Sequence, residues 1–311
     1  MARILASRFN SLKTTVDRLL GPCLETNTSS GNYTLGYGET PSSYLAQTST
    51  NDLIDAEAYQ GLYLDVAKIK IHQVGTSAFT PLAYRIGDFV TNASADKVEE
   101  AYIAGIETLA TDITTNKFLC HSSQADLLPA DTSITSSNWN GTLSHIVKVT
   151  FSSAQERREY FNAGGLIRFT PSVSYSGSQA KTLDWKTTIN EIGVVSFGCQ
   201  GTSAPSGQGQ AYGGIGHDYM SSTYQTAYFN QGGGVYTPNR YTIYALELSD
   251  TELQFKTELT DPSYGQPDEQ VLASVVNLVQ FFRPNGTATI NGVSHTTVQR
   301  AIPTAQTISA F

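Results

Sequence analysis

The chain has 311 residues, of which 40% are hydrophobic and 15% charged, and its formal net charge is −8. The charged share is well below the roughly 25% that is usual for a soluble globular domain. The 17 Tyr and 13 Phe residues indicate a β-rich chain with a neutral polar surface. Phosphate contacts need clustered Lys and Arg, which this acidic sequence lacks, so we expect no nucleic-acid partner.

The sequence carries no signal for secretion, a membrane or a metal. Its first residues lack a long apolar segment, and no run approaches the length of a membrane span, so we expect neither secretion nor membrane insertion. Cys23, Cys120 and Cys199 are widely spaced and include no C-x-x-C pair. This spacing predicts reduced, mostly buried thiols instead of a disulfide framework or a zinc site.

The first helix is predicted from an apolar stripe over residues 2–20, where hydrophobic side chains recur at spacings of four and three. Gly21-Pro22 supplies the stop signal. Two interpretations stay open for this stripe: it packs inside the chain's own helical core, or it docks the chain onto another subunit. The candidate interface residues are Leu5, Phe9, Leu12, Val16 and Leu19.

Two more amphipathic helices are expected before residue 116. The earlier one ends near Gly75 and has His72 in its last turn, where we expect the imidazole to interact with the negative end of the helix. Three such helices can bury one another, so residues 1–116 are predicted to form a helical docking or oligomerisation region. The stripes are Tyr59, Leu62, Val66 and Ile69, then Val98, Tyr102, Ile106, Leu109 and Ile113.

Residues 145–193 are expected to form a central packing motif that begins with a short helix. Ser153 and Glu156 have the spacing of a capping box, in which the hydroxyl accepts from the backbone amide three residues on. Gly164-Gly165 then allows a left-handed stop, which a side chain would make costly. The sequence therefore predicts a helix that ends in a tight corner at the two glycines.

After this corner, a strand enters at Leu166 with the alternating burial of a half-buried sheet. A second short helix follows, carries Leu183, Trp185, Ile189 and Ile192, and ends at Gly193. Packing explains every one of these side chains without chemistry, so we interpret the motif as structural. The residues that define the motif are Phe161, Asn162, Gly164, Gly165, Arg168 and Trp185.

From about residue 117 the pattern is that of short strands separated by turns rich in Gly, Pro, Asn and Asp. Both faces of segment 240–248 carry apolar side chains, which favours two stacked sheets. The predicted fold class is α+β, mainly β, with an N-terminal helical region followed by an antiparallel β-sandwich over residues 117–311. The expected strands are 147–151, 194–197, 223–229, 240–248, 252–259 and 271–282.

No arrangement of residues predicts catalysis. A hydrolase needs a nucleophile, a base and an orienting group, and no G-x-S-x-G elbow accompanies His145 or His217. The Gly-rich stretch 200–216 lacks the spacing and the Lys of a phosphate-binding loop, so we expect a flexible surface loop that could contact a neighbouring subunit. The acidic residues Asp261, Asp268 and Glu269 lack the spacing of a calcium loop, which predicts solvated turn residues. We expect no enzyme, no cofactor and no metal.

Four motifs occur in a fixed order along the chain, and together they carry a resemblance. They are R-F-N-x-L-x-x-x-V-x-x-L-L-G-P (8–22), G-Y-G-E (36–39), I-x-x-H-Q-x-G (69–75) and E-R-R-E-Y-F-N-A-G-G-L-I-R-F (156–169), the last followed by Trp185. This set resembles virion structural proteins of tailed bacteriophages. The segment with Asp268 before V-L-A-S-V-V and Arg283-Pro284 after the strand resembles the C-terminal strands of the same family. With it the resemblance covers most of the chain, and the loop at 200–216 matches least well.

The resemblance implies a non-enzymatic virion protein, assembled in the host cytoplasm and located at the neck or collar, the tail or baseplate, or the fibre attachments. Its partners would be other virion proteins and copies of itself, since virion parts are built on rotational axes. An alternative is a receptor- or glycan-binding fibre module, because Tyr, Trp, Asn and Asp can stack on and hydrogen-bond sugars. A polymer-degrading enzyme would need paired carboxylates facing a groove, and the spacing identifies no pair.

Overall fold

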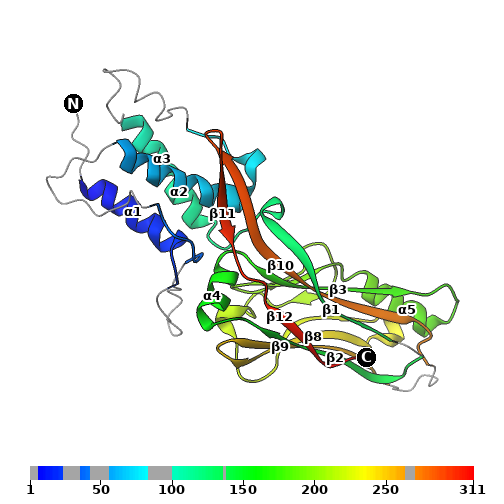
Figure 1. The fold of residues 1–311 in the computed structure, drawn as a ribbon. Coiled ribbons are helices and arrows are strands. Elements are labelled where there is room, and N and C mark those ends of the chain that lie inside the picture. The colour runs from blue at the N-terminus through cyan, green and yellow to red at the C-terminus, as the bar shows by residue number, and fades with distance from the viewer. Residues whose placement is uncertain (1–5, 24–35, 43–55, 83–99, 136–137, 263–269) are drawn as a thin grey trace. The chain divides into compact units, whose positions relative to one another are not determined.

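The computed structural model describes residues 6–23, 36–42, 56–82, 100–135, 138–262 and 270–311 (Figure 1). The fold is α+β and mainly β, with three longer helices toward the N-terminus and two antiparallel sheets, as predicted. The predicted stripe residues Leu5 and Val98, together with Asp268 and Glu269, lie outside the described residues.

The chain divides into two compact units, which we call unit 1 and unit 2. Unit 1 is drawn from residues 1–126, 158–164 and 284–300, and unit 2 from residues 127–157, 165–283 and 301–311. The division therefore differs from the predicted boundary between residues 116 and 117. The helical unit also recruits two later segments, and local sequence patterns cannot reveal such long-range recruitment.

Unit 1 contains α1 (Ala6–Leu20), α2 (Ala56–Val74) and α3 (Glu100–Thr115), which match the three predicted helices. α2 is followed by Gly75, whose φ of 82° is a conformation that glycine adopts at little cost. The helices bury a shared apolar core, in which the rings of Phe9 and Tyr59 meet edge to face at 5.1 Å.

The apolar stripe of α1 lies in this core. Its described members are buried among residues of α2 and α3 and are not available to a second subunit in the folded chain. This corrects the interface hypothesis and supports the first interpretation, because burying the stripe inside unit 1 removes its apolar surface from water. The four residues concerned are Phe9, Leu12, Val16 and Leu19.

Unit 1 is completed by a hairpin made from the end of β10 (Ser274–Ile290) and β11 (Val293–Gln299). Asn291 and Gly292 connect the strands with φ values of 53° and 81°, the left-handed pair that two-residue hairpins prefer. Ala288, Ile290 and Val298 join the helical core. β11 packs against α2, so the hairpin covers one side of that helix.

Unit 2 is a β-sandwich. Phe169 and Phe197 of the first sheet pack on Phe255 of the second, with ring centroids 5.3 and 5.0 Å apart. The first sheet has the order β1 (Ala125–Ile134), β10, β3 (Leu166–Ser174), β4 (Val195–Phe197), β5 (Thr202–Ser203). The second has the order β12 (Thr304–Ser309), β2 (Gly141–Thr150), β9 (Glu252–Asp261), β8 (Arg240–Ser249), β7 (Gln225–Gln231), β6 (Gln210–Ala211).

β10 extends well beyond the predicted strand 271–282 and passes through Pro284. The partner of β10 changes at this proline, since Phe282 is the last residue paired with β3 and Asn285 the first paired with β11. A proline has no N–H to donate to a ladder, so it is tolerated where one partner strand replaces another. The Pro284 carbonyl still accepts from the Arg300 amide at 2.9 Å.

The predicted packing motif contains α4 (Ala154–Asn162) and α5 (Ala180–Asn190). The Ser153 hydroxyl accepts from the Glu156 amide at 3.0 Å, as a capping box requires, and the Glu156 carboxylate accepts from the Ala301 amide at 2.9 Å. On α5, Trp185 and Ile189 are buried as predicted. Leu183, which was predicted with them as part of this helix, is 39% exposed, because residues two positions apart on a helix, such as Leu183 and Trp185, do not share a face.

Candidate functional site

Two of the sequence motifs meet in unit 1. The G-Y-G-E segment follows the end of α1, and the amides of Tyr37, Gly38 and Glu39 donate to carbonyls of residues 19–21 at 2.9 to 3.0 Å. The Tyr37 hydroxyl is buried, donates to the Lys117 carbonyl at 2.6 Å and accepts from Gln73 at 3.0 Å. Burial raises the pKa of this phenol. The segment is therefore fixed by hydrogen bonds on both sides.

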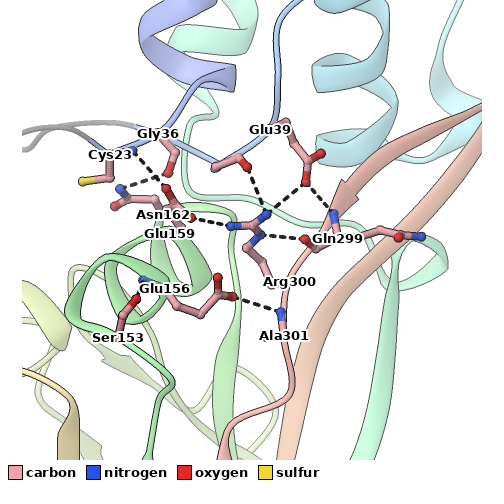
Figure 2. A network of polar contacts seen from close by, with 11 residues as sticks. Cys23, Gly36, Glu39, Ser153, Glu156, Glu159, Asn162, Gln299, Arg300 and Ala301 are labelled. Atoms are coloured by element: carbon pink, nitrogen blue, oxygen red, sulfur yellow. Dashed lines mark hydrogen bonds and ion pairs between the residues drawn. The ribbon is translucent and has the colours of Figure 1, made fainter.

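The centre of this junction is an ion pair between Glu159 of α4 and Arg300 after β11 (Figure 2). Glu159 Oε2 lies 2.5 Å from Arg300 Nη1, and Glu159 Oε1 accepts from the Cys23 amide at 3.1 Å. Arg300 Nη2 donates to the Gly38 carbonyl at 3.1 Å and lies 3.3 Å from Glu39. The side chains of the pair are 5% and 10% exposed, so removing one partner would leave a buried charge. Four distant segments are held together here.

His72 lies beside this junction, and its hydrogen-bond partner is not the end of its own helix, as expected, but the Ala163 carbonyl. Its Nε2 is 2.7 Å from the Ala163 carbonyl, and its ring is buried against Tyr37 at 5.4 Å. Burial lowers the pKa of His72 to about 4, so at neutral pH the ring is uncharged and Nε2–H donates to that carbonyl. The role of His72 is structural.

Cys120 lies 3.8 Å from His72 Nδ1, but the two residues do not form a reactive pair. Burial raises the pKa of the Cys120 thiol to about 12, so the nucleophilic thiolate is absent at neutral pH. The thiol donates to the Gln124 carbonyl at 3.4 Å. All three cysteines are free thiols, as the sequence predicts, and Cys23 and Cys199 are buried.

The structure divides the predicted motif residues between the units. Phe161, Asn162 and Gly164 belong to unit 1, where Phe161 packs edge to face on Tyr160 at 5.3 Å and Asn162 donates to the Gly36 carbonyl at 3.4 Å. The conformation of Gly164 has a φ of 81°, and a Cβ there would lie 2.7 Å from the Cys120 amide nitrogen. Gly165, Arg168 and Trp185 belong to unit 2. Arg168 stacks over the Phe282 ring at 5.9 Å, in the cross-strand position expected for a packing role.

Unit 2 holds a buried polar cluster that the sequence did not indicate. Lys181 of α5 lies 2.6 Å from Asp261 at the end of β9, and both side chains are nearly inaccessible, 7% and 1% exposed. Asp261 was expected to be a solvated turn residue, and its burial corrects that expectation. The rings of Trp139 and Trp185 pack edge to face with centroids 5.0 Å apart, and both are buried, so neither indole can stack on a sugar.

His145 and His217 also have structural partners. His145 Nδ1 is 2.8 Å from Asn277 and Nε2 is 3.3 Å from Asp131, and burial lowers the pKa of its ring. His217 accepts from Arg157 at 3.1 Å. Within the described part of the chain, no three His, Cys, Asp or Glu side chains are grouped as a metal would require.

The Gly-rich stretch 200–216 is packed against its surroundings, in contrast to the flexible loop expected. Its backbone bonds to itself and to neighbours, including Thr202 to the Tyr212 carbonyl and Gln208 to the Glu191 carbonyl. A Cβ at Gly207 would overlap the Ile192 carbonyl, and one at Gly201 would overlap Gly213. These glycines are needed because backbone approaches backbone closely.

Exposed apolar side chains lie on and beside β12, the strand at one end of the second sheet. Ile302 and Ile308 are 53% and 51% exposed, and β12 ends the second sheet, so one of its sides has no strand partner among the described strands. Residues 301–311, which we call the C-terminal edge segment, contain no charged side chain. The segment is tied to β1 by Thr307, which donates to Asp131 at 2.7 Å, and by the Phe311 amide, which donates to Ser133 at 2.8 Å.

A second surface feature is a groove between α1 and α3 in unit 1, with a volume of about 480 Å³. Arg8 and Glu107 form an ion pair across it at 2.5 Å. Its floor is rich in threonines, whose hydroxyls donate to carbonyls one turn earlier in their own helices. The groove therefore offers few unsatisfied polar groups to a ligand.

Comparison with known proteins yields no match: no protein-family description fits the chain, and neither the curated proteins nor the solved structures include a similar one. Across the residues that the structure describes, no helix combines the length and the apolar character needed to cross a membrane.

Proposed function

We propose that the chain is a non-enzymatic structural protein of a tailed-bacteriophage virion, a neck or collar, tail or baseplate component. It acts through protein–protein interfaces with copies of itself and with other virion proteins. The four ordered sequence motifs support this proposal, and in the structure their residues make packing and hydrogen-bonding contacts. Motif residues that serve the fold and carry no chemistry suit a protein that is itself a part of an assembled particle.

The C-terminal edge segment is the observation that carries the assembly part of the proposal. Proteins normally protect an edge strand with charged residues or cover it, because an open edge pairs with other chains. Here an uncharged edge presents two half-exposed isoleucines on a chain with a net charge of −8. Two acidic copies would meet with least repulsion at such a segment, and a symmetric oligomer needs a self-complementary surface of this kind.

The location is tested by mass spectrometry of purified particles from the source of this sequence. We expect the chain in every particle preparation, at a copy number set by a rotational axis and in constant ratio to the other virion proteins. Recovery of the chain only in the particle-free lysate would contradict the virion assignment.

The interface is tested with the full chain carrying Ile308→Lys. A charge at the edge should weaken self-association at least tenfold, about 1.4 kcal/mol, measured by light scattering over a dilution series. Val235→Lys is the matched control, because Val235 is also an exposed aliphatic residue but lies between β7 and β8. Equal effects of the two variants, or a wild-type chain that stays monomeric at all concentrations, would contradict the edge interface.

Three exposed tyrosines support the alternative of a glycan-binding fibre module. Tyr212, Tyr219 and Tyr224 are each more than a third exposed, whereas both tryptophans are buried. A sugar-binding surface of this kind should retain polysaccharide from the bacterial host on immobilised protein, and Tyr219→Ala should reduce that retention. If Tyr219→Ala retained the polysaccharide as well as the wild-type chain does, the exposed tyrosines would no longer support the glycan-binding alternative.

A further inference from the structure

Three side chains with complementary chemistry converge in unit 2. Lys181 Nζ lies 2.6 Å from Asp261 Oδ2 and 3.3 Å from Asn140 Oδ1. Asn140 directly precedes β2, whose first residue, Gly141, is the cross-strand partner of Asp261. The amine, the amide and the carboxylate are therefore delivered by α5, by the start of β2 and by the end of β9.

Two buried tryptophans lie close in the chain to members of this cluster, Trp139 directly before Asn140 and Trp185 one helical turn after Lys181. Their rings pack on one another, and Trp139 is fixed by a two-way backbone bridge to Val271 at 2.8 and 3.1 Å. Asn239 lies between Trp185 and the cluster: in the amide orientation that satisfies both neighbours, its nitrogen donates to Asp261 Oδ1 at 3.0 Å and its oxygen accepts from the indole at 3.1 Å. Asn239 therefore satisfies Asp261 Oδ1, while Asp261 Oδ2 contacts Lys181 as an ion pair and has no hydrogen-bond donor among the described residues.

A buried ion pair of this kind is weak evidence for a stabilising role, because desolvation of the two charges offsets their attraction. A buried lysine, in contrast, can lose its proton to a neighbouring carboxylate and become a nucleophile. The electrophile within reach is the side-chain amide of Asn140. The positions of Lys181 on α5, Asn140 directly before β2 and Asp261 at the end of β9 supply the proximity that lets a slow reaction between an amine and an amide proceed.

We propose that Lys181, Asn140 and Asp261 form a self-reacting isopeptide site, in which Lys181 Nζ becomes bonded to the side-chain carbonyl carbon of Asn140. Asp261 Oδ2 takes a proton from the ammonium group, and the free amine attacks the Asn140 carbon. The new N–C bond forms as the bond to Asn140 Nδ2 breaks. Both protons that Nζ gives up pass through Asp261 to Nδ2, which leaves as ammonium. Asp261 ends as the carboxylate it began as, and no oxidant or cofactor is needed.

The product would be a covalent link across 41 residues of chain. Like a disulfide, such a link restricts the unfolded chain and so stabilises the fold. Unlike a disulfide, it does not depend on an oxidising compartment, which agrees with the three free cysteines of this chain. The inference is independent of the proposed virion role, because it depends only on the geometry inside unit 2.

The test is the intact mass of the full chain under denaturing conditions, followed by peptide mapping. We expect a mass below that of the sequence by one ammonia, and a branched peptide that joins Lys181 to Asn140. The variants Lys181→Arg, Asn140→Ala and Asp261→Asn should each restore the full mass. Lys186→Arg is the matched control on the same helix. Lys186 donates to the Tyr175 carbonyl, so this variant should still show the loss of ammonia.

Two results would overturn the proposal. One is the full sequence mass in the wild-type chain, both fresh and after prolonged incubation. The other is an ammonia loss confined to a linear Asn140-Gly141 peptide, which would indicate cyclisation of the asparagine on its own backbone instead of a bond to Lys181. The wild-type measurement stands even if a variant fails to fold.

Discussion

At the scale of single residues, His72 links the stability of unit 1 to pH. The buried ring is neutral in the folded chain, and burial lowers its pKa from 6.5 to about 4. The unfolded chain binds a proton at higher pH than the folded chain does, so acid favours unfolding. The contribution of His72 is fully present above about pH 6.5, and it is lost as the pH falls toward about 4.

The variant His72→Gln tests this linkage. Glutamine can still donate to the Ala163 carbonyl, but it does not titrate. Between pH 6.5 and about 4 the wild-type chain should lose roughly 3 kcal/mol of unfolding free energy more than the variant does. The measurement is urea unfolding followed by helical circular dichroism at several pH values. Parallel pH profiles of the two chains would show that the histidine is protonated in the folded state.

At the scale of elements, the stop at the end of α4 depends on glycine for two separable reasons. Gly164 and Gly292 share a φ of 81°, but a Cβ would meet the backbone of residues 119 and 120 only at Gly164. At Gly292 nothing lies within 4 Å. The hairpin glycine therefore serves as a matched control for the backbone conformation alone.

Gly292→Ala should lower the free energy of unfolding by about 1 kcal/mol, because alanine adopts the left-handed backbone conformation less readily than glycine does. Gly164→Ala should lower the free energy of unfolding by the same amount and by roughly a further 1 to 3 kcal/mol, because the backbone of residues 119 and 120 must also shift. Both changes lie in unit 1, so one unfolding signal reports on both. Equal losses in the two variants would show that the contact at Gly164 relaxes freely.

The elements also show what the sequence could predict. Helices α1 to α3 were predicted from their periodic stripes, and the capping of α4 from the spacing of Ser153 and Glu156. Strands β1, β5, β6, β11 and β12 were not predicted. β1 and β12 are edge strands with one buried side chain between them, β11 is exposed at most positions, and β5 and β6 have two residues each. None of them carries the alternating burial that marks a strand in a sequence.

The residues of the candidate sites could not be paired from the sequence either. Lys181, Asp261 and Asn140 lie far apart in the chain and belong to no motif, so only the pairing of β2 with β9 and the docking of α5 bring them together. Glu159 was part of a recognised motif, but its partner Arg300 lies 141 residues later. Tertiary pairing at such separations leaves no local pattern in one sequence.

At the scale of the whole molecule, the chain passes between the two units five times along its length, by the order of their segments. Each unit can nevertheless be followed separately. Both tryptophans, Trp139 and Trp185, belong to unit 2, whereas the three long helices belong to unit 1. Tryptophan fluorescence therefore reports on unit 2, and helical circular dichroism reports mainly on unit 1.

The variant Glu159→Gln uses these two signals to test what holds unit 1 together. It keeps the size of the side chain but leaves the Arg300 charge, 10% exposed, without its closest partner. Breaking a buried pair from one side costs roughly 3 to 5 kcal/mol. Glu107→Gln breaks another Arg–Glu pair of unit 1 whose side chains are about a third exposed, so its cost should stay below about 1 kcal/mol.

In urea, Glu159→Gln should lower the midpoint of the circular dichroism transition much more than that of the tryptophan transition, while Glu107→Gln should move neither midpoint strongly. The reason is that Glu159, Arg300 and the junction partners named above, Cys23, Gly38 and Glu39, belong to unit 1. Equal shifts in both signals would mean that the two units unfold as one cooperative structure. In that case the five chain passages would couple the two units, so that breaking the ion pair in unit 1 would destabilise the β-sandwich of unit 2 as well.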